Sequence, residues 1–267
     1  MKIAMLFPYA PAYRELIYRK MDEQFDIDWF FCGDIVRPLK ILDYSVLNTC
    51  DLSMSERSIV KTIHYYKGIR NLNLGKYDII IAPPVIRCLS IWWLVWKYGN
   101  RKSGPKVYFW THGWYGREKG LVAWLKKLFL QRTDVFLLYN QTAKYLMIDN
   151  GFDADKMYVI YNSLNYDKQL PLRQTLFVDT VYSCHFNNNN RNIVFIGRLT
   201  REKRFDLLID AVAELKGKGV MVNVTFIGDG EERKAMERRV EELGVGNQMW
   251  FYGACYDEMK NADTSVY

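Results

Sequence analysis

The stretch Asn192–Asp206 reads N-I-V-F-I-G-R-L-T-R-E-K-R-F-D and carries the clearest structural signal in the chain. Its apolar residues 193–196 are typical of a parallel strand that is buried on both faces, and Gly197 ends that strand. Thr200 is expected to cap a helix over residues 201–216. The apolar residues of that helix recur at the spacing of one face, and they are Phe205, Leu208, Ile209, Val212 and Leu215. The order of strand, glycine turn and helix predicts an α/β fold.

Two cations flank the predicted start of this helix. Arg198 and Lys203 lie five positions apart, beyond the carboxyl end of the strand. In an open α/β sheet this position attracts anions, because backbone N–H groups and the helix dipole point at it. Both side chains can therefore converge on one pyrophosphate without a metal ion. The spacing alone fits an ordinary βα turn with two solvated cations equally well.

The motif G-R-L-x-x-E-K-x-x-D, which follows the apolar strand, resembles the donor-binding element of retaining glycosyltransferases of family 4. Members of that family have the GT-B fold. The resemblance implies an α/β, GT-B-like chain with two Rossmann-like domains, the second of them incomplete. It further implies that Arg198 and Lys203 hold the diphosphate of a nucleotide sugar, with Gly197 in the vicinity of the nucleotide.

Composition and charge limit the function classes. The chain has 267 residues, of which 49% are hydrophobic and 25% charged, which is a globular composition. The excess of positive charge lies in residues 1–165, with 23 Lys+Arg against 15 Asp+Glu, whereas residues 166–267 hold 14 against 15. A basic, aromatic first half suits an anionic membrane surface, a phosphate-bearing acceptor or RNA on charge alone. Because no recognition motif accompanies the charge, no nucleic acid is expected as a partner.

The cysteines and the apolar runs indicate where in the cell the protein is found. The five cysteines are odd in number and form no C-x-x-C pair, so a reducing cytosol is the simplest setting. The longest apolar run, Cys88–Trp96, has about half of the ~20 residues that span a bilayer. The apolar run before Pro8 is too short for a signal peptide. We expect a cytoplasmic protein, with peripheral contact at the cytoplasmic face of the inner membrane as an additional expectation.

The first half of the chain alternates predicted strands and helices. Strands are expected at Lys2–Phe7, Asp26–Phe31, Asp78–Ala82, Lys106–Trp110 and Asp134–Tyr139. Helices are expected at 13–24, 86–98 and 141–150, with a further amphipathic helix after Lys119. Residues 33–76 have no clear pattern apart from weak strands near 45–48 and 59–65.

The motif T-H-G-W-Y-G follows the predicted strand 106–110 and places His112 at its carboxyl end. A lone histidine at this position is more typical of a satisfied hydrogen-bonding residue than of a reacting one. However, T-H-G-x-Y-G resembles the acceptor-domain loop of family 4 enzymes, whose histidine approaches the transferred sugar. The resemblance implies a role for His112 in the catalytic site, although not as a proton-transferring base.

Two D-x-D pairs are candidates for metal binding. Asp26 and Asp28 share one face of a predicted strand, and Asp153 and Asp155 lie at a turn. Neither pair has a third ligand nearby in sequence. We therefore interpret the first as a solvated strand start and the second as a loop or helix-start turn, and we expect no metal.

Aromatic and basic residues gather in two predicted helices. Trp92, Trp93 and Trp96 are interpreted as core residues, with an interfacial anchor as the alternative. In the next helix one stripe is apolar, formed by Leu121, Trp124, Leu125 and Leu128. Lys126, Lys127 and Arg132 lie away from that stripe. This region is the best candidate for a surface that faces a membrane.

The remaining sequence predicts the domain organisation. Residues 1–165 form an acceptor-side Rossmann-like domain, 166–190 a linker, and 191–267 part of a nucleotide-sugar-binding domain. Y-V-I-Y-N-S-L resembles the family's strand and asparagine turn between the domains, which implies that Asn162 lies near the crevice. In the second domain, strands are expected at 221–227 and 248–252 and a helix at 231–243. Gly253 and Cys255 lie where the family holds the nucleotide base.

The resemblance ends early. Only eight residues separate Gly253 from Ala262, too few for an ordinary parallel crossover, and the family's later glutamate motif has no counterpart before Tyr267. We therefore expect a C-terminally truncated member.

The expected function is transfer of a sugar, with retention, from a UDP- or GDP-linked donor to a glycan or lipid-linked acceptor in polysaccharide biosynthesis. No cofactor or metal is expected. The alternative is a catalytically inactive fragment that acts at most as a nucleotide- or membrane-binding module.

Overall fold

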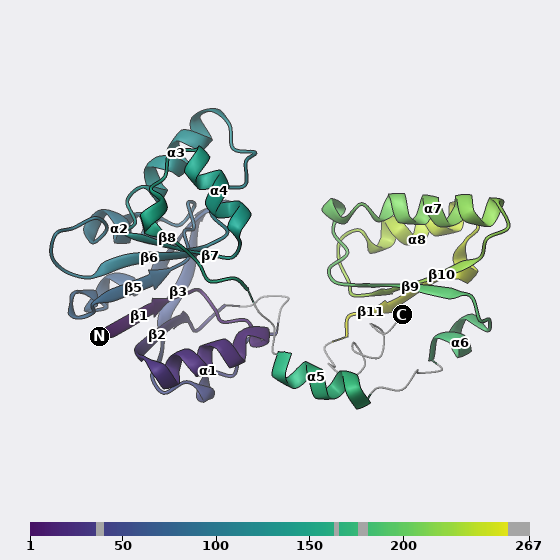
Figure 1. Cartoon of the computed structure of the whole chain (residues 1–267), viewed down its shortest axis with the longest axis horizontal. Coiled ribbons are helices and arrows are strands. Elements are labelled where there is room, and N and C mark those ends of the chain that lie inside the picture. The colour runs from purple at the N-terminus through teal and green to yellow at the C-terminus, as the bar shows by residue number, and fades with distance from the viewer. Residues whose placement is uncertain (36–39, 163–165, 176–180, 256–267) are drawn as a thin grey trace. The chain divides into compact units, whose positions relative to one another are not determined.

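The structure is a computed structural model, and it describes residues 1–35, 40–162, 166–175 and 181–255. The chain divides into two compact units, Met1–Asn165 and Tyr166–Tyr267 (Figure 1). Each unit contains a wholly or mainly parallel β-sheet with helices packed on it, as expected for an α/β chain.

The first unit is built on an eight-stranded sheet with the order β4-β3-β2-β1-β5-β6-β7-β8. All neighbouring strands pair in parallel except β3 and β4, which form an antiparallel hairpin. The strands are β1 (Lys2–Leu6), β2 (Asp26–Cys32), β3 (Cys50–Val60), β4 (Ile63–Lys67), β5 (Ile79–Ala82), β6 (Lys106–Thr111), β7 (Val135–Leu138) and β8 (Met157–Val159).

Helices cover both faces of this sheet (Figure 1). They are α1 (Glu15–Gln24), α2 (Leu89–Lys97), α3 (Gly120–Leu130) and α4 (Gln141–Asp149). In β1, Ile3 and Met5 pack in the core that contains Tyr18 of α1, whereas Ala4 and Leu6 pack in the core of the opposite face. The central strands are therefore buried on both sides, which is why they are continuous apolar runs in the sequence.

Short 3-10 helices connect several of these elements. They are η1 (Ala12–Arg14), η2 (Tyr44–Val46), η3 (Ile69–Asn71), η4 (Leu74–Lys76) and η5 (Ala154–Lys156). The strand predicted near residues 45–48 is wrong, because η2 occupies this place. The Asp43 carboxylate accepts a hydrogen bond from the Ser45 N–H at 3.0 Å, which favours a turn. The weak pattern at 59–65 corresponds to the turn of the β3–β4 hairpin.

The second unit contains a parallel three-stranded sheet with the order β11-β10-β9. Its elements are α5 (Tyr166–Thr175), α6 (Val181–Phe186), β9 (Arg191–Ile196), η6 (Arg201–Lys203), α7 (Phe205–Gly217), β10 (Val222–Ile227), α8 (Arg233–Glu242), η7 (Gly246–Gln248) and β11 (Met249–Gly253). Helices α7 and α8 lie together on one face of the sheet (Figure 1). Ile209, Phe226 and Met236 are buried between these layers.

Strand β9 lies where it was predicted, but the expectation that it is buried on both faces is wrong. Ile193 is 40% exposed and Ile196 is 46% exposed. Within the described residues β9 is an edge strand that pairs only with β10, and the core built by α7 and α8 covers only one of its faces. An apolar run in the sequence of β9 therefore does not mean that both faces of this strand are buried.

The range 166–190, predicted as a linker, contains helices α5 and α6. In α6, the His185 ring stacks on Trp250 of β11 with ring centroids 3.9 Å apart, and Phe186 is buried. Asn188 accepts a hydrogen bond from the Asn223 side chain of β10 at 2.8 Å. The residues before β9 are thus packed within the second unit.

Candidate functional site

The loop after β9 carries the two cations of the motif. Helix α7 begins at Phe205 and not at residue 201, so the predicted helix start is wrong. Residues 201–203 form the separate turn η6, and Arg204 adopts a left-handed conformation with φ of 52° that interrupts the helix. The Thr200 side chain makes no capping hydrogen bond to the backbone of η6, which corrects its predicted role as a helix cap.

Arg198 and Lys203 are both exposed on this loop. In the part of the chain that the structure describes, neither forms an ion pair with a carboxylate, whereas Arg204 pairs with Asp206 at 2.8 Å. Hydrogen bonds from the Glu202 backbone and the Thr200 hydroxyl lower the pKa of Glu202, with smaller contributions from Arg198 and Arg201. The motif therefore presents two cations whose side chains are available to an anionic ligand.

Backbone hydrogen bonds tie this loop to the next two strands. The Leu199 N–H donates to the Asp229 carbonyl at 3.0 Å, and the Gly228 N–H donates to the Gly253 carbonyl at 2.8 Å. A Cβ atom on Gly228 would lie 1.8 Å from the Gly197 carbonyl oxygen. The structure thus gives the reason for a glycine at this position, which is close backbone contact between two loops.

The structure thus brings together some of the predicted donor-side residues. Gly197, Arg198 and Gly253 lie at the carboxyl ends of β9 and β11, the two parallel strands that flank β10, and Lys203 lies on the same loop as Arg198. Cys255 is half-buried two residues beyond β11. The carboxyl edge of a parallel sheet is where ligands bind in open α/β folds.

His112 lies in the first unit, directly after β6, and is exposed. Its ring centroid is 4.3 Å from that of Tyr139. The following Gly113 has φ of 69°, and a Cβ atom there would lie 2.8 Å from the Met147 Sδ atom, so glycine is required to present the histidine. Partial desolvation of the ring and the nearby charge of Arg14 lower the pKa of His112, which keeps its imidazole neutral at pH 7.

His112 also lines a cavity of about 350 Å³ in the first unit. The cavity lies at the carboxyl ends of β1, β5 and β6, and its wall is rich in aromatic side chains. Among the lining residues are Phe7, Tyr13, Arg14, Trp110, His112 and Tyr139. The sequence indicated Arg14 only as part of a helix start. No sequence signal identifies it as a cavity residue, because Trp110 and Tyr139 come from distant strands.

Asn162 lies in the first unit, three residues beyond β8, and is exposed. The preceding Tyr161 has φ of 59°, so the backbone turns sharply at this place. Asn162 and His112 belong to the first unit, and the predicted donor-side residues belong to the second.

The two D-x-D pairs are structural. Asp28 is buried, accepts a hydrogen bond from the Tyr77 hydroxyl and pairs with Lys2 Nζ at 3.2 Å, so the interpretation of a solvated strand start is wrong for this residue. Burial raises the pKa of Asp28, but the bonds from Tyr77 and Lys2 outweigh it and the pKa is lowered. Asp153 accepts a hydrogen bond from the Asp155 N–H, as expected for a helix-start turn. Across the described ranges, no three His, Cys, Asp or Glu residues are grouped for metal binding.

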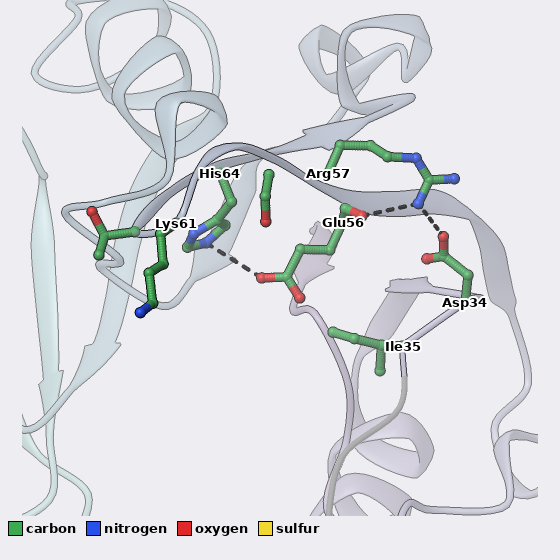
Figure 2. A pocket seen from close by; sticks show the side chains of 8 residues that line it. Asp34, Ile35, Glu56, Arg57, Lys61 and His64 are labelled. Atoms are coloured by element: carbon green, nitrogen blue, oxygen red, sulfur yellow. Dashed lines mark hydrogen bonds and ion pairs between the residues drawn. The ribbon is translucent and has the colours of Figure 1, made fainter.

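A second cavity, of about 400 Å³, lies beside the β3–β4 hairpin (Figure 2). Arg57 pairs there with Asp34, and His64 Nε2 lies 3.5 Å from the Glu56 carboxylate. The two acidic residues of this cavity, Asp34 and Glu56, thus both have partners, and Lys61 also lines it.

The aromatic and basic helices have different surroundings. Trp92 and Trp93 pack against the core, as interpreted, whereas Trp96 is exposed and lies against the Arg132 guanidinium at 4.0 Å. On α3, Leu121 is 71% exposed and Trp124 is 59% exposed. No helix among the described residues is long and apolar enough to cross a bilayer.

Comparison with known proteins gives matches of two kinds. Residues 184–267 match the family model "Glycosyl transferases group 1". A segment of 160 residues is 22% identical to an uncharacterized 41.2 kDa protein in the cps region of Klebsiella pneumoniae, and the match covers 54% of this chain and 41% of that protein. The chain therefore spans less than half of the length of this relative.

Solved structures share the fold over the whole chain. The lipopolysaccharide outer core galactosyltransferase WaaB is 17% identical with a TM-score of 0.60, covering 100% of this chain and 71% of its own. Anabaena Alr3699/HepE in complex with UDP-glucose is 16% identical with a TM-score of 0.65, covering 98% of this chain and 72% of its own. The chain thus has an α/β fold of the GT-B type, and its residues 184–267 match the glycosyl transferases group 1 family.

Proposed function

We propose that this protein is a glycosyltransferase of polysaccharide biosynthesis, which moves a sugar from a nucleoside-diphosphate donor to a glycan or lipid-linked acceptor. The observation that carries the proposal is the presence of two exposed cations, Arg198 and Lys203, on a loop at the carboxyl edge of the second sheet, where neither forms an ion pair with a described carboxylate. The family match covers this loop, and HepE has the same fold and was solved with UDP-glucose. The cps-region relative supports polysaccharide biosynthesis.

The proposed mechanism uses this loop to stabilise the leaving group. As the bond between sugar and diphosphate breaks, negative charge grows on the diphosphate oxygens, and two fixed cations lower the energy of that state. In this proposal Gly197, Gly253 and Cys255 lie beside the nucleotide. We further propose a reaction of the retaining family 4 type that needs neither a metal nor a cofactor, with a UDP- or GDP-linked donor.

In the first unit, we assign His112 and Asn162 to the vicinity of the transferred sugar. The neutral imidazole of His112 can exchange hydrogen bonds with sugar hydroxyl groups. A base is not required, because a retaining transfer can deliver the acceptor proton to the departing diphosphate.

The proposal is tested by incubating the protein with a panel of nucleotide sugars and acceptors. We expect transfer from one UDP- or GDP-sugar, with the anomeric configuration retained in the NMR spectrum of the product. Inversion at the anomeric carbon would contradict the retaining mechanism. Nucleotide binding without turnover by the complete protein would instead favour the inactive alternative.

The lowered pKa of His112 gives a prediction about pH. Because its imidazole stays neutral until below the usual histidine value of about 6.5, we expect kcat/KM to change little between pH 7 and 8 and to fall only on the acid side of that value. His112→Ala should reduce kcat/KM by about tenfold or more, since each lost hydrogen bond to substrate is worth about 1.5 kcal/mol.

The check is a pH profile of both proteins. A control is His185→Ala, which removes an exposed histidine that stacks on Trp250 in the second unit. An acid limb that is unchanged in His112→Ala would assign this titration to another group.

We also propose that the protein is cytoplasmic and contacts an anionic membrane through α3. Exposed Leu121 and Trp124 lie one helix turn apart, beside the exposed Lys119. Replacing Leu121 and Trp124 by serine should weaken binding to vesicles with anionic lipid by about tenfold, because apolar side chains lose their contact with the acyl layer.

Cosedimentation with such vesicles measures this effect. The matched control is Leu207→Ser, which removes an exposed leucine from α7 in the second unit. Equal vesicle binding by the two variants would argue against a membrane-facing α3.

A further inference from the structure

Arg14 is a buried cation without a carboxylate partner. It lies at the end of η1 and is 9% exposed. Its guanidinium carbon lies 5.3 Å from the ring centroid of Tyr13, 5.4 Å from that of Trp110 and 5.1 Å from that of Tyr139. No ion pair joins it to an acid among the described residues. Since burying a charge is unfavourable unless it is paired, this site lacks a counter-ion.

The surroundings of Arg14 are rich in hydrogen-bond donors. The Arg14 Nε and the Trp110 Nε1 are both buried, and neither has a hydrogen-bond partner. Both residues line the cavity that also contains His112, and no Asp or Glu of the described ranges lines this cavity. Burial opposes the charge of Arg14, but the nearby Tyr139, Tyr18 and Tyr13 outweigh it and raise the pKa, so the cation is kept. The Tyr139 and Tyr18 side chains also hydrogen-bond to the guanidinium, but a neutral phenol supplies no counter-charge. The missing group is therefore an acceptor with negative charge.

We propose that Arg14 binds an oxyanion, phosphate or carboxylate, carried by the acceptor. The planar guanidinium matches both groups, because two N–H donors can face two oxygens. The aromatic wall offers flat apolar surface to the sugar ring that bears the anion, and a volume of about 350 Å³ lies in the range of small-molecule sites. The inference rests on the proposed function, since it names the acceptor as an acidic sugar or sugar phosphate.

The cavity of Arg14 and the predicted donor loop are built by different units. Arg14 and every residue that lines its cavity belong to the first unit, whereas Arg198 and Lys203 belong to the second. An acidic acceptor held by Arg14 would lie in the same cavity as His112, the residue assigned to the transferred sugar. This placement selects acceptors by charge and leaves recognition of the nucleotide to the other unit.

The test compares binding of glucose 1-phosphate, glucuronate and glucose. It uses the protein with Arg198→Gln and Lys203→Gln, so that the phosphate cannot occupy the donor site. We expect at least one of the two anions to bind tenfold or more tightly than glucose, and we expect Arg14→Gln to abolish that preference. The anion that is preferred distinguishes a phosphate-bearing from a carboxylate-bearing acceptor.

The control is Arg19→Gln, which removes an exposed cation of α1 that pairs with Glu15. It should keep the preference for the anion. Arg14→Lys keeps the positive charge but loses the paired N–H donors of the guanidinium, so it should keep part of the preference for an anion over glucose. Equal binding of glucose and both anions, or a preference that survives Arg14→Gln, would overturn the inference.

A second measurement needs no change at Arg14. Because the Arg14 charge helps to lower the pKa of His112, an oxyanion that offsets this charge should raise that pKa. NMR titration of the imidazole with and without the anion measures the shift, and an unchanged titration at saturating anion contradicts the site. UDP binding in the otherwise unaltered protein should not change in Arg14→Gln. If UDP binds but no anion preference is found, only this inference fails; if the preference holds without UDP binding, the proposed function fails.

Discussion

Replacing both Arg198 and Lys203 with glutamine is expected to weaken binding of UDP or GDP by about 100-fold or more. Each charge-assisted hydrogen bond to a phosphate contributes about 1.5–3 kcal/mol, and 1.4 kcal/mol corresponds to a factor of ten in affinity. Neither side chain is held by a carboxylate in the described structure, so the loss should not be offset by the release of an ion pair. Titration calorimetry with each nucleotide measures the effect.

The matched control is Arg201→Gln. Arg201 is an exposed cation of η6 on the same loop, between the two residues of the motif, and the resemblance assigns it no role. It lowers the net charge by one, as each single variant does, so a general electrostatic effect would appear here too. If the double variant binds both nucleotides as tightly as the unaltered protein, the donor site does not lie on this loop.

Local apolar patterns predicted the strands better than they predicted what covers them. The central strands β1 and β2 were predicted from their apolar runs, because a strand that is buried on both faces has apolar residues at successive positions. Strand β9 has a similar run, but Ile193 and Ile196 are exposed. Burial depends on the layers that pack on a sheet, and a single run of residues does not contain that information.

Some residues of the candidate site could be predicted from the sequence, and others could not. Arg198, Lys203 and His112 lie in short motifs, so their places after β9 and β6 could be predicted from the sequence. Arg14 could not, because its partners Trp110 and Tyr139 come from strands far along the chain. The start of α7 was misplaced because Arg204 adopts a left-handed conformation, which a residue of this type rarely does.

Substituting Gly228 with alanine is expected to destabilise the second unit by about 3 kcal/mol or more. The residue has φ of 149°, in a region that only glycine adopts without strain, which itself contributes about 1–3 kcal/mol. The added Cβ atom would also lie 1.8 Å from the Gly197 carbonyl oxygen, and the atoms that it meets belong to the backbone of Gly197, which cannot move aside as a flexible side chain does. Separating the loops would weaken the backbone hydrogen bonds from Gly228 to Gly253 and from Leu199 to Asp229. Native-state amide hydrogen exchange of β9, β10 and β11 measures the loss of stability of this unit.

The matched control is Gly217→Ala at the end of α7. An added Cβ atom there meets no other atom within 4 Å, and alanine favours a helix, so stability should stay the same or rise slightly. The same glycine contact positions the loop of Arg198 and Lys203, so Gly228→Ala should also weaken UDP binding under conditions where the unit remains folded. Stability and affinity that both match those of Gly217→Ala would mean that the loops can separate freely, and that close contact between backbones does not position the two cations.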